Sequence, residues 1–516
     1  MTLLLFILSL PVLFTIPALF AYKLVEKAGI PGWKMLIPYY NLVILIQLTG
    51  RSYWWFLWLS IPFINIFTFI LLIIELIKGF NRYSMLDQVL VALFPFIYLP
   101  WLSFQSQEWV LLADRPQIKK SAVREWTDAI VFAVIAASII RIFLVEAYTI
   151  PTSSMEKSLL VGDFLFVSKM AYGSRSPETP IAFPFVHHTL PFTAFTKSYV
   201  EWLKFPYHRF PGFGKVKNND VVVFNYPSGD TVVLEQQNQD YYQIVRTMEM
   251  DQQRRKGDLY KEGMGRDEVW RRYHVTARPV DKRENYIKRC IAISGDTIEI
   301  IDHQVYINSK MTDNPENMQF MYDVFTNGTS LNPRTLDKLE VNEAGQISNS
   351  HYVMPLSEDK KAKIENFANV ESVKVRNRQK GQPFSPIFPH DTKNFRWNED
   401  NFGPLVIPQK GSTVNISSEN IALYKKIISK YENNTLEIKD NAIYINGELA
   451  TSYTFKLDYY WMMGDNRHNS ADSRYWGFVP EDHIVGKASF VWLSLEKSKS
   501  LFAGKIRWNK LFRVIK

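Results

Sequence analysis

Cysteine is almost absent from this sequence. Cys290 is the only one in 516 residues, so the chain cannot form an intramolecular disulfide. Any folded part that lies outside the cytoplasm must therefore be held together by its hydrophobic core. The long polar portion after residue 147 has enough chain to build such a core.

Other signatures are missing as well. No spacing of histidine, cysteine or carboxylate residues is typical of a metal site, and no glycine-rich phosphate-binding loop occurs. These absences predict an activity that needs no metal and no other cofactor. The net charge is +9, but no nucleic-acid-binding motif accompanies it. Because much of the basic charge flanks apolar segments, we expect no nucleic-acid partner.

Apolar residues are concentrated in the first 147 positions. Four segments approach the length that crosses a bilayer, the third being the weakest: residues 2–22, 54–77, 86–104 and 126–147. A cleavable signal peptide is the alternative for the first, but it has no basic start and no small-x-small cleavage site. The pattern predicts a multi-span membrane region of uncertain role over residues 1–125, an anchor helix over residues 126–147, and the lipid bilayer as a partner.

The connection before the last apolar segment indicates the orientation. Residues 105–125 contain Arg115, Lys119, Lys120 and Arg124. Basic residues in short loops favour the cytoplasmic side of a membrane. Everything after about residue 147 is then predicted to lie outside the cytoplasm, anchored to a cytoplasmic (inner) membrane by a multi-pass region.

The chain after residue 147 has the pattern of an antiparallel β domain. Short runs such as DFLFVSKM and DVVVFNYP alternate in polarity and are separated by Gly, Asn and Asp turns. We assign residues 148–495 to one catalytic domain, with inserts at about 236–284 and 309–423. The first insert is polar and is predicted to be helical or flexible. Residues 496–516 form a basic C-terminal tail.

Three segments carry the most specific pattern, and they begin at Ile150 (IPTSSMEKSLLVGDFLFVSKMAYG), Tyr286 (YIKRCIAISGD) and Gly464 (GDNRHNSADSRYWGFVP). In this order they resemble the motif boxes of the bacterial type I signal peptidases, which are membrane-bound serine proteases with a serine/lysine dyad. The resemblance covers Trp126 to about Leu493 with long interruptions. It implies N-terminal transmembrane helices followed by a mainly β extracytoplasmic domain of coiled antiparallel sheets.

A serine nucleophile needs an adjacent base. The nine histidines show no pattern that singles one out. A lysine can act instead if burial lowers its pKa toward neutrality. Lys288 lies in an alternating run typical of a half-buried strand, where it shares a face with Tyr286, Cys290 and Ala292.

The resemblance assigns roles to individual residues. Ser154 matches the nucleophile and Lys288 matches the base, while Thr152 matches the hydroxyl that supports the oxyanion. Ser470 matches the serine that hydrogen-bonds the base. Two structural ion pairs are implied, Arg289 with Asp465 and Asp472 with Arg474.

The same resemblance predicts an apolar pocket that accepts a small residue before the cleaved bond. Its walls are Ile150, Met155, Leu159, Tyr286 and Ile287. The chain departs from the family pattern at two places. Glu156-Lys157 stands where Met-Pro is usual, which affects this pocket, and His468 stands where aspartate is expected. We interpret His468 as surface variation and Ser153 as a spacer.

The function implied is that of a serine endopeptidase that cleaves signal peptides from exported preproteins at the membrane surface. Two alternatives remain open. One is a membrane-tethered Ser/Lys autoprotease, and the other is a non-catalytic membrane assembly factor of the same fold. The membrane segments and the long third box disfavour the first, and the intact Ser154, Lys288 and Ser470 disfavour the second.

Part of the second box is repeated further along the chain. Residues 286–308 align without gaps to residues 424–446, and Lys288 then aligns with Lys426. Convergence of two hairpins and partial duplication both explain the match. We expect Lys426 to lie on a strand with a solvated amine, and we select Lys288 as the base from its local motif.

Overall fold

The computed structural model describes residues 12–61, 64–116, 121–227, 231–237, 239–261, 263–341, 343–496, 499–500 and 504–515. The chain divides into two compact units, Met1–Phe143 and Leu144–Lys516. The boundary falls close to the end of the predicted anchor helix. Each unit has hydrophobic core clusters of its own.

The first unit is helical. Its central cluster contains Leu42, Leu72, Leu76 and Leu99, and its helices are α2 (Val12–Leu19), α3 (Tyr22–Lys27), α4 (Tyr40–Leu48), α5 (Trp55–Leu59), α6 (Ile64–Lys78), α7 (Met85–Leu93), α8 (Pro95–Ser103) and α9 (Ala122–Ile139). Helix α9 begins at an N-cap, where Ser121 Oγ accepts a hydrogen bond from the backbone N–H of Arg124 (3.3 Å).

Most of the predicted spans are shorter than expected. Residues 54–77 form two helices, α5 and α6, and residues 86–104 form α7 and α8, which are separated at Phe94 because the residue before Pro95 is disfavoured in helical geometry. For residues 2–22, positions 2–11 lie outside the described residues, and α2 ends at Leu19. These segments therefore do not confirm a multi-span region.

One helical segment in the described part of the chain is long and apolar enough to cross a membrane. It runs from Ala122 to Leu144, which is 23 residues with a mean hydropathy of 2.1, and 6% of its apolar 18-residue stretch is buried. A π-helical turn, Ile140–Leu144, forms its last part. It ends before residue 147, the predicted limit, because Val145–Thr149 is already a strand.

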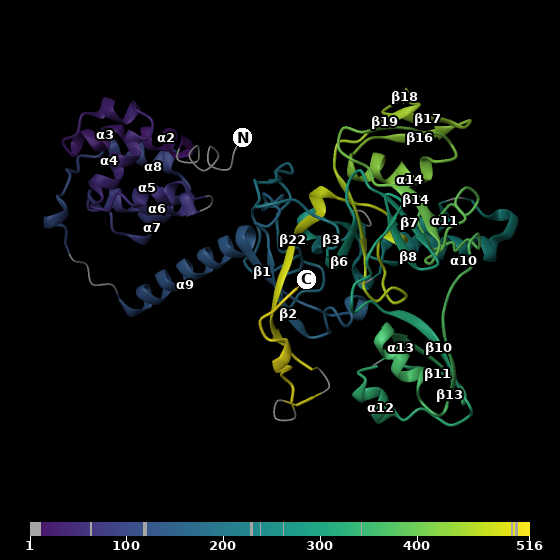
Figure 1. The fold of residues 1–516 in the computed structure, drawn as a ribbon. Coiled ribbons are helices and arrows are strands. Elements are labelled where there is room, and N and C mark those ends of the chain that lie inside the picture. The colour runs from purple at the N-terminus through teal and green to yellow at the C-terminus, as the bar shows by residue number, and fades with distance from the viewer. Residues whose placement is uncertain are drawn as a thin grey trace. The chain divides into compact units, whose positions relative to one another are not determined.

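The second unit is built on an antiparallel sheet of eight strands (Figure 1). The order is β1 (Val145–Thr149), β2 (Asp163–Ser168), β22 (Ile484–Ser494), β3 (Val221–Asn225), β6 (Asn285–Ala292), β20 (Tyr459–Met463) and β21 (Val479–Pro480), with β23 (Arg513–Val514) beside β22. Hydrophobic clusters cover both faces of this sheet. Val221 and Val223 pack on one face, and Val222 and Cys290 pack on the other. Strand β6 is therefore buried on both faces beyond Ile287 rather than half-buried.

Both copies of the repeat contain a hairpin of the same register. Ile298 pairs with Ile307 in β7 (Thr297–Ile301) and β8 (Gln304–Ile307), as Leu436 pairs with Ile445 in β16 (Leu436–Lys439) and β17 (Ala442–Ile445). The residues before each hairpin differ, because 285–292 is strand β6 whereas Ile421–Lys426 is helix α14.

The predicted inserts are folded. Residues 236–284 contain helices α10 (Tyr241–Lys256) and α11 (Met264–Arg272). Within 309–423, a sheet of β11 (Gly345–Ser348), β12 (His351–Leu356), β10 (Phe320–Thr326) and β13 (Val370–Val375) packs with α12 (Pro333–Lys338) and α13 (Glu358–Glu365) around its own core. We call residues 320–375 the inserted module, and Figure 1 shows its elements gathered together. The tail returns to the main sheet through β23.

Candidate active site

Ser154 and Lys288 meet in the second unit. Ser154 lies on a short 3-10 turn, Ser153–Met155, which follows β1, and Lys288 lies on β6. Lys288 Nζ donates a hydrogen bond to Ser154 Oγ at 2.6 Å. Both residues are buried, with exposed fractions of 8% for Ser154 and 3% for Lys288.

Burial changes the protonation of Lys288. Desolvation lowers the pKa of its amine to about 8, although the charges of Asp472 and Asp465 act in the opposite direction. The amine also donates to the backbone carbonyl of Ile287 (3.0 Å). The amine can thus exist in the neutral form near physiological pH while it touches a serine hydroxyl.

The third box encloses the turn that carries Ser154. The backbone N–H of Asn466 donates to the carbonyl of Ser154 (3.1 Å). A Cβ atom on Gly464 would lie 2.2 Å from Ser470 Oγ and 2.5 Å from the Ser154 carbonyl oxygen. Glycine is needed at position 464 because Ser470 and the Ser154 backbone both approach it closely.

Ser470 is close to this turn, but it does not make the predicted contact. Among the described residues, no hydrogen bond joins it to Lys288. Ser470 Oγ is buried and has no hydrogen-bond partner in the described part of the chain. Burial raises the pKa of the neighbouring Asp472, whereas the Arg474 charge and hydrogen bonds from Arg474 and from the Gly464 backbone N–H lower it overall.

The two predicted ion pairs are formed and buried. Arg289 donates to Asp465 with two nitrogens, at 2.9 and 2.7 Å, and Arg474 donates to Asp472 at 2.9 and 2.8 Å. Ser158 Oγ donates to Asp465 at 2.5 Å. The Asp465 carboxylate therefore links β6 to the chain just after the nucleophile turn.

Thr152 and Ser153 flank Ser154 differently. Thr152 is exposed, and its side chain makes no capping hydrogen bond to the turn. Ser153 Oγ accepts a hydrogen bond from Asn469 Nδ2 at 3.3 Å. The backbone of Ser153 is held as well, since its carbonyl accepts from Asn466 Nδ2 at 3.3 Å.

The predicted pocket residues belong to two different clusters. Ile150, Met155 and Leu159 are fully buried in the core below the nucleophile turn, and Ile287 packs against the edge of that core. Tyr286 packs on the other face of β6, where its ring stacks on Tyr226 with 4.6 Å between centroids. Tyr286 and Ile287 are thus the two members that keep some exposed surface.

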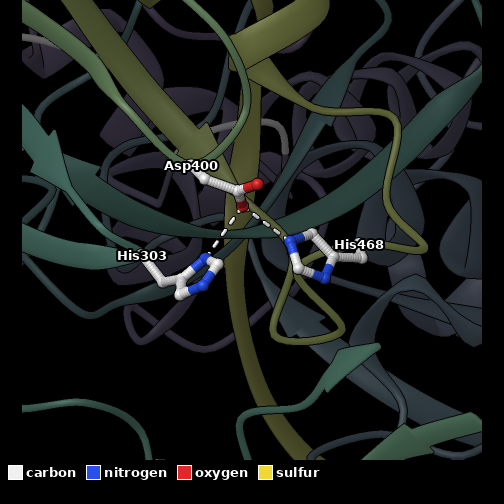
Figure 2. Close-up of side chains that lie close together, drawn as sticks. All are labelled: His303, Asp400 and His468. Atoms are coloured by element: carbon white, nitrogen blue, oxygen red, sulfur yellow. Dashed lines mark hydrogen bonds and ion pairs between the residues drawn. The ribbon is translucent and has the colours of Figure 1, made fainter. Parts of the chain in front are cut away.

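His468 is not surface variation, and the prediction was wrong here. It is largely buried, with its Nε2 2.6 Å from Asp400 Oδ1, and His303 Nδ1 lies 2.9 Å from the same oxygen (Figure 2). Burial raises the pKa of Asp400, but hydrogen bonds from both histidines hold it well below its usual range. The departure from the family pattern at His468 was the one feature of the sequence that could have indicated this cluster. Nothing in the sequence indicated that Asp400 or His303 belongs to it.

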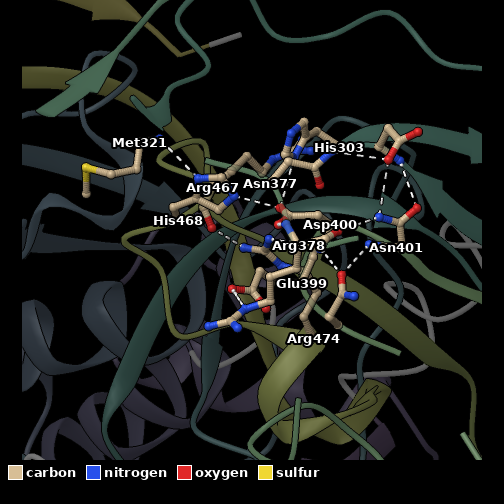
Figure 3. Close-up of polar contacts among 12 residues, drawn as sticks. His303, Met321, Asn377, Arg378, Glu399, Asp400, Asn401, Arg467, His468 and Arg474 are labelled. Atoms are coloured by element: carbon tan, nitrogen blue, oxygen red, sulfur yellow. Dashed lines mark hydrogen bonds and ion pairs between the residues drawn. The ribbon is translucent and has the colours of Figure 1, made fainter. Parts of the chain in front are cut away.

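These three residues are of the types that bind metal ions, and their ligand atoms lie within 4.8 Å of one another. The hydrogen bonds around these residues indicate a structural role rather than metal binding. The backbone N–H of Met321 donates to His468 Nδ1 at 3.1 Å (Figure 3). The ring proton therefore lies on Nε2 and faces Asp400, so this tautomer offers no lone pair to an ion there. The cluster acts as a hydrogen-bonded clamp between β10 and the third box.

Lys426 also differs from expectation. It is the last residue of helix α14 rather than part of a strand, and its amine is not solvated. Lys426 Nζ donates to the carbonyl of Trp476 at 3.2 Å, and burial lowers the pKa of the amine to about 8. Burial alone therefore does not distinguish Lys288 from Lys426 as a candidate base. The two lysines differ because Lys288 donates a hydrogen bond to a serine hydroxyl.

Comparison with known proteins agrees with this geometry. The model of the family described as "Signal peptidase, peptidase S26" matches residues 123–362 and 406–493. The chain belongs to this signal peptidase family. It is accordingly a serine peptidase, a hydrolase of peptide bonds. A second model, for a family of unknown function, matches residues 33–110 in the first unit.

Several curated relatives named "Signal peptidase I" are similar over most of their length. The protein of Haemophilus influenzae is 24% identical over 466 residues, which cover 88% of this chain and 93% of the relative. That of Helicobacter pylori (strain J99) is 24% identical, with 74% and 89% covered. That of Buchnera aphidicola subsp. Baizongia pistaciae is 22% identical, with 72% and 77% covered.

Proposed function

We propose that this peptidase removes N-terminal signal peptides from exported preproteins, with Ser154 as nucleophile and Lys288 as general base. The observation that supports this most directly is the 2.6 Å contact between Lys288 Nζ and Ser154 Oγ. The same amine has a pKa lowered to about 8 by burial. A lysine is a useful base when its pKa lies near the working pH.

The proposed reaction needs no cofactor. Neutral Lys288 takes the proton of Ser154 Oγ as that oxygen attacks the scissile carbonyl, and it returns the proton to the departing amine. Water then hydrolyses the acyl-enzyme. Thr152, together with the backbone N–H of Ser154, would stabilise the oxyanion, a contribution of about 3 kcal/mol for one such donor. Ser470, whose buried hydroxyl has no hydrogen-bond partner among the described residues, would orient Lys288 after a small rotation of its side chain.

Substrate access follows from the position of the nucleophile in the chain. Ser154 comes shortly after Leu144, where the apolar helix ends. We propose that this helix and a multi-pass N-terminal region anchor the enzyme in the inner membrane, with the catalytic unit on the extracytoplasmic side. A signal peptide held in the same bilayer would present its cleavage site near Ser154, which replaces a search in solution by a local one.

The proposal is tested with the full chain in detergent and a purified preprotein. We expect wild-type protein to release the mature form, with a new N-terminus that mass spectrometry identifies, and Ser154→Ala to release none. Self-cleavage of the enzyme without preprotein cleavage would instead support an autoprotease. An intact preprotein with no self-cleavage would overturn the peptidase mechanism.

A further inference from the structure

The inserted module is fixed to the third box by backbone hydrogen bonds. The N–H of Gln319 donates to the carbonyl of Asp465, and the N–H of Arg467 donates to the carbonyl of Gln319, both at 2.9 Å. Two residues further on, the Met321 N–H donates to His468 Nδ1, and His468 in turn is hydrogen-bonded to Asp400, which also binds His303. The start of β10 is therefore positioned relative to the residues that enclose Ser154.

The far end of the module contacts the residues that flank the nucleophile turn. Lys157 Nζ donates to the backbone carbonyl of Glu340 at 2.6 Å and lies 3.2 Å from its carboxylate. Asn469 Nδ2 donates to Glu343 at 2.6 Å while it also contacts Ser153. Lys157 stands where the family pattern has proline, so this contact comes from a departure from that pattern. The module thus contacts Lys157, just after the nucleophile turn, and Asn469, which itself contacts Ser153.

A cavity of about 1090 Å³ lies between the module, the nucleophile turn and the C-terminal segment. The lining is rich in charged side chains of both signs, and its members include Ser153, Glu156, Lys157, Glu340, Glu343 and Arg507. This volume stands at the upper end of the range of ligand pockets, which extends to about 1,000 Å³, so the cavity is large enough for more than a single side chain. The lining begins at the residue next to the proposed nucleophile.

We propose that this cavity binds the polypeptide that follows the scissile bond, so that the inserted module is a specificity element for the mature part of the substrate. The inference rests on the proposed function. The apolar signal peptide does not match a charged lining, whereas the polar start of an exported protein does. The partly exposed Tyr286 and Ile287 beside Lys288 offer the apolar surface for the other side of the bond.

The test compares two peptides that share the residues before the cleavage site. One ends two residues after the bond and the other ends ten residues after it. We expect wild-type kcat/KM to be about tenfold higher for the long peptide, mainly through KM. Glu343→Lys should reduce this ratio to within about twofold. Glu371→Lys, an exposed charge reversal on β13 of the same module, should leave the ratio unchanged.

Photo-crosslinking provides a readout that does not depend on turnover or on the Glu343 variant. The full-length Ser154→Ala protein is irradiated with a long peptide that carries a photoreactive phenylalanine five residues after the bond. We expect crosslinks to residues 337–343 or 156–161. Crosslinks only elsewhere, or equal wild-type rates on both peptides, overturn the inference. Wild-type protein that cleaves neither peptide overturns the proposed function instead.

Discussion

At the scale of single residues, the chemistry of Lys288 depends on segments that lie far from it in the chain. Alternation in the second box predicts a strand for Lys288, yet it also predicts one solvated face, whereas both faces of β6 are covered. The burial that lowers the lysine pKa comes from segments distant in the chain. His468 shows the same limit, because its partners Asp400 and His303 are brought to it only by the fold.

The identity of the nucleophile can be checked with two neighbouring serines. Ser154→Ala should abolish cleavage while the protein keeps its thermal stability, because the hydroxyl is the attacking atom. Ser153→Ala removes only the contact with Asn469 and should retain activity within about a few-fold of wild type. Preprotein cleavage and a thermal melt measure the two effects. Reversed results would shift the assignment by one residue.

The pH dependence should report the amine of Lys288. Its pKa is lowered to about 8, so kcat/KM should rise with pH and reach half its plateau near pH 8, as the protonated lysine becomes neutral. Lys288→Arg should be inactive at every pH, since a guanidinium stays protonated. Initial rates on a peptide substrate measure this. An active Lys288→Arg enzyme would remove lysine from the mechanism.

At the scale of elements, hairpins could be predicted better than the segments before them. The repeated pattern of residues 297–308 and 435–446 gives two hairpins of equal register, because the alternation and the turn residues, with Asp302 and Asp440 at equivalent places, lie within each hairpin. The residues aligned with β6 lie instead in helix α14 and in the π-helical turn Ile427–Tyr431 that follows it. Strand β6 forms because β3 and β20 pair with it, and such pairing is not encoded locally.

The helical setting of Lys426 changes what its replacement should do. Lys426→Met keeps most of the side-chain volume and removes an amine that donates to the Trp476 carbonyl and lies over the Tyr431 ring. We expect cleavage to persist with an unchanged pH midpoint, whereas Lys288→Met should abolish it. Rates measured across pH for the two variants provide the comparison. Loss of cleavage in Lys426→Met alone would make the second copy the working one.

The buried ion pair between β6 and the third box should matter for stability. Asp465 is fully buried and accepts two hydrogen bonds from Arg289. Asp465→Ala leaves that guanidinium buried without its counter-charge, which costs about 3–5 kcal/mol. Chemical denaturation of the detergent-solubilised protein should show this loss. Glu371→Ala, an exposed site on β13, is the control and should change stability by less than about 0.5 kcal/mol.

At the scale of the whole molecule, hydropathy separated the chain near the correct place, whereas only one of its predicted spans is confirmed as a candidate among the residues that the structure describes. The boundary between the units falls at Phe143, inside the predicted anchor. Runs such as 54–77 and 86–104 are apolar along their length, yet they form pairs of short helices that pack on one another in the first unit. Average hydropathy does not distinguish a helix that faces lipid from one that faces a protein core.

The orientation of the catalytic unit can be measured directly. Basic residues before the apolar helix, including Arg115 and Arg124, predict that this connection is cytoplasmic and that residues after 147 are not. Lys119 and Lys120, on which the argument also depends, lie outside the described residues. In sealed, inverted inner-membrane vesicles, added protease should therefore leave the catalytic unit intact and should digest it once detergent opens the membrane. Digestion before detergent would place the unit in the cytoplasm, where signal peptides of exported proteins could not reach Ser154 after translocation.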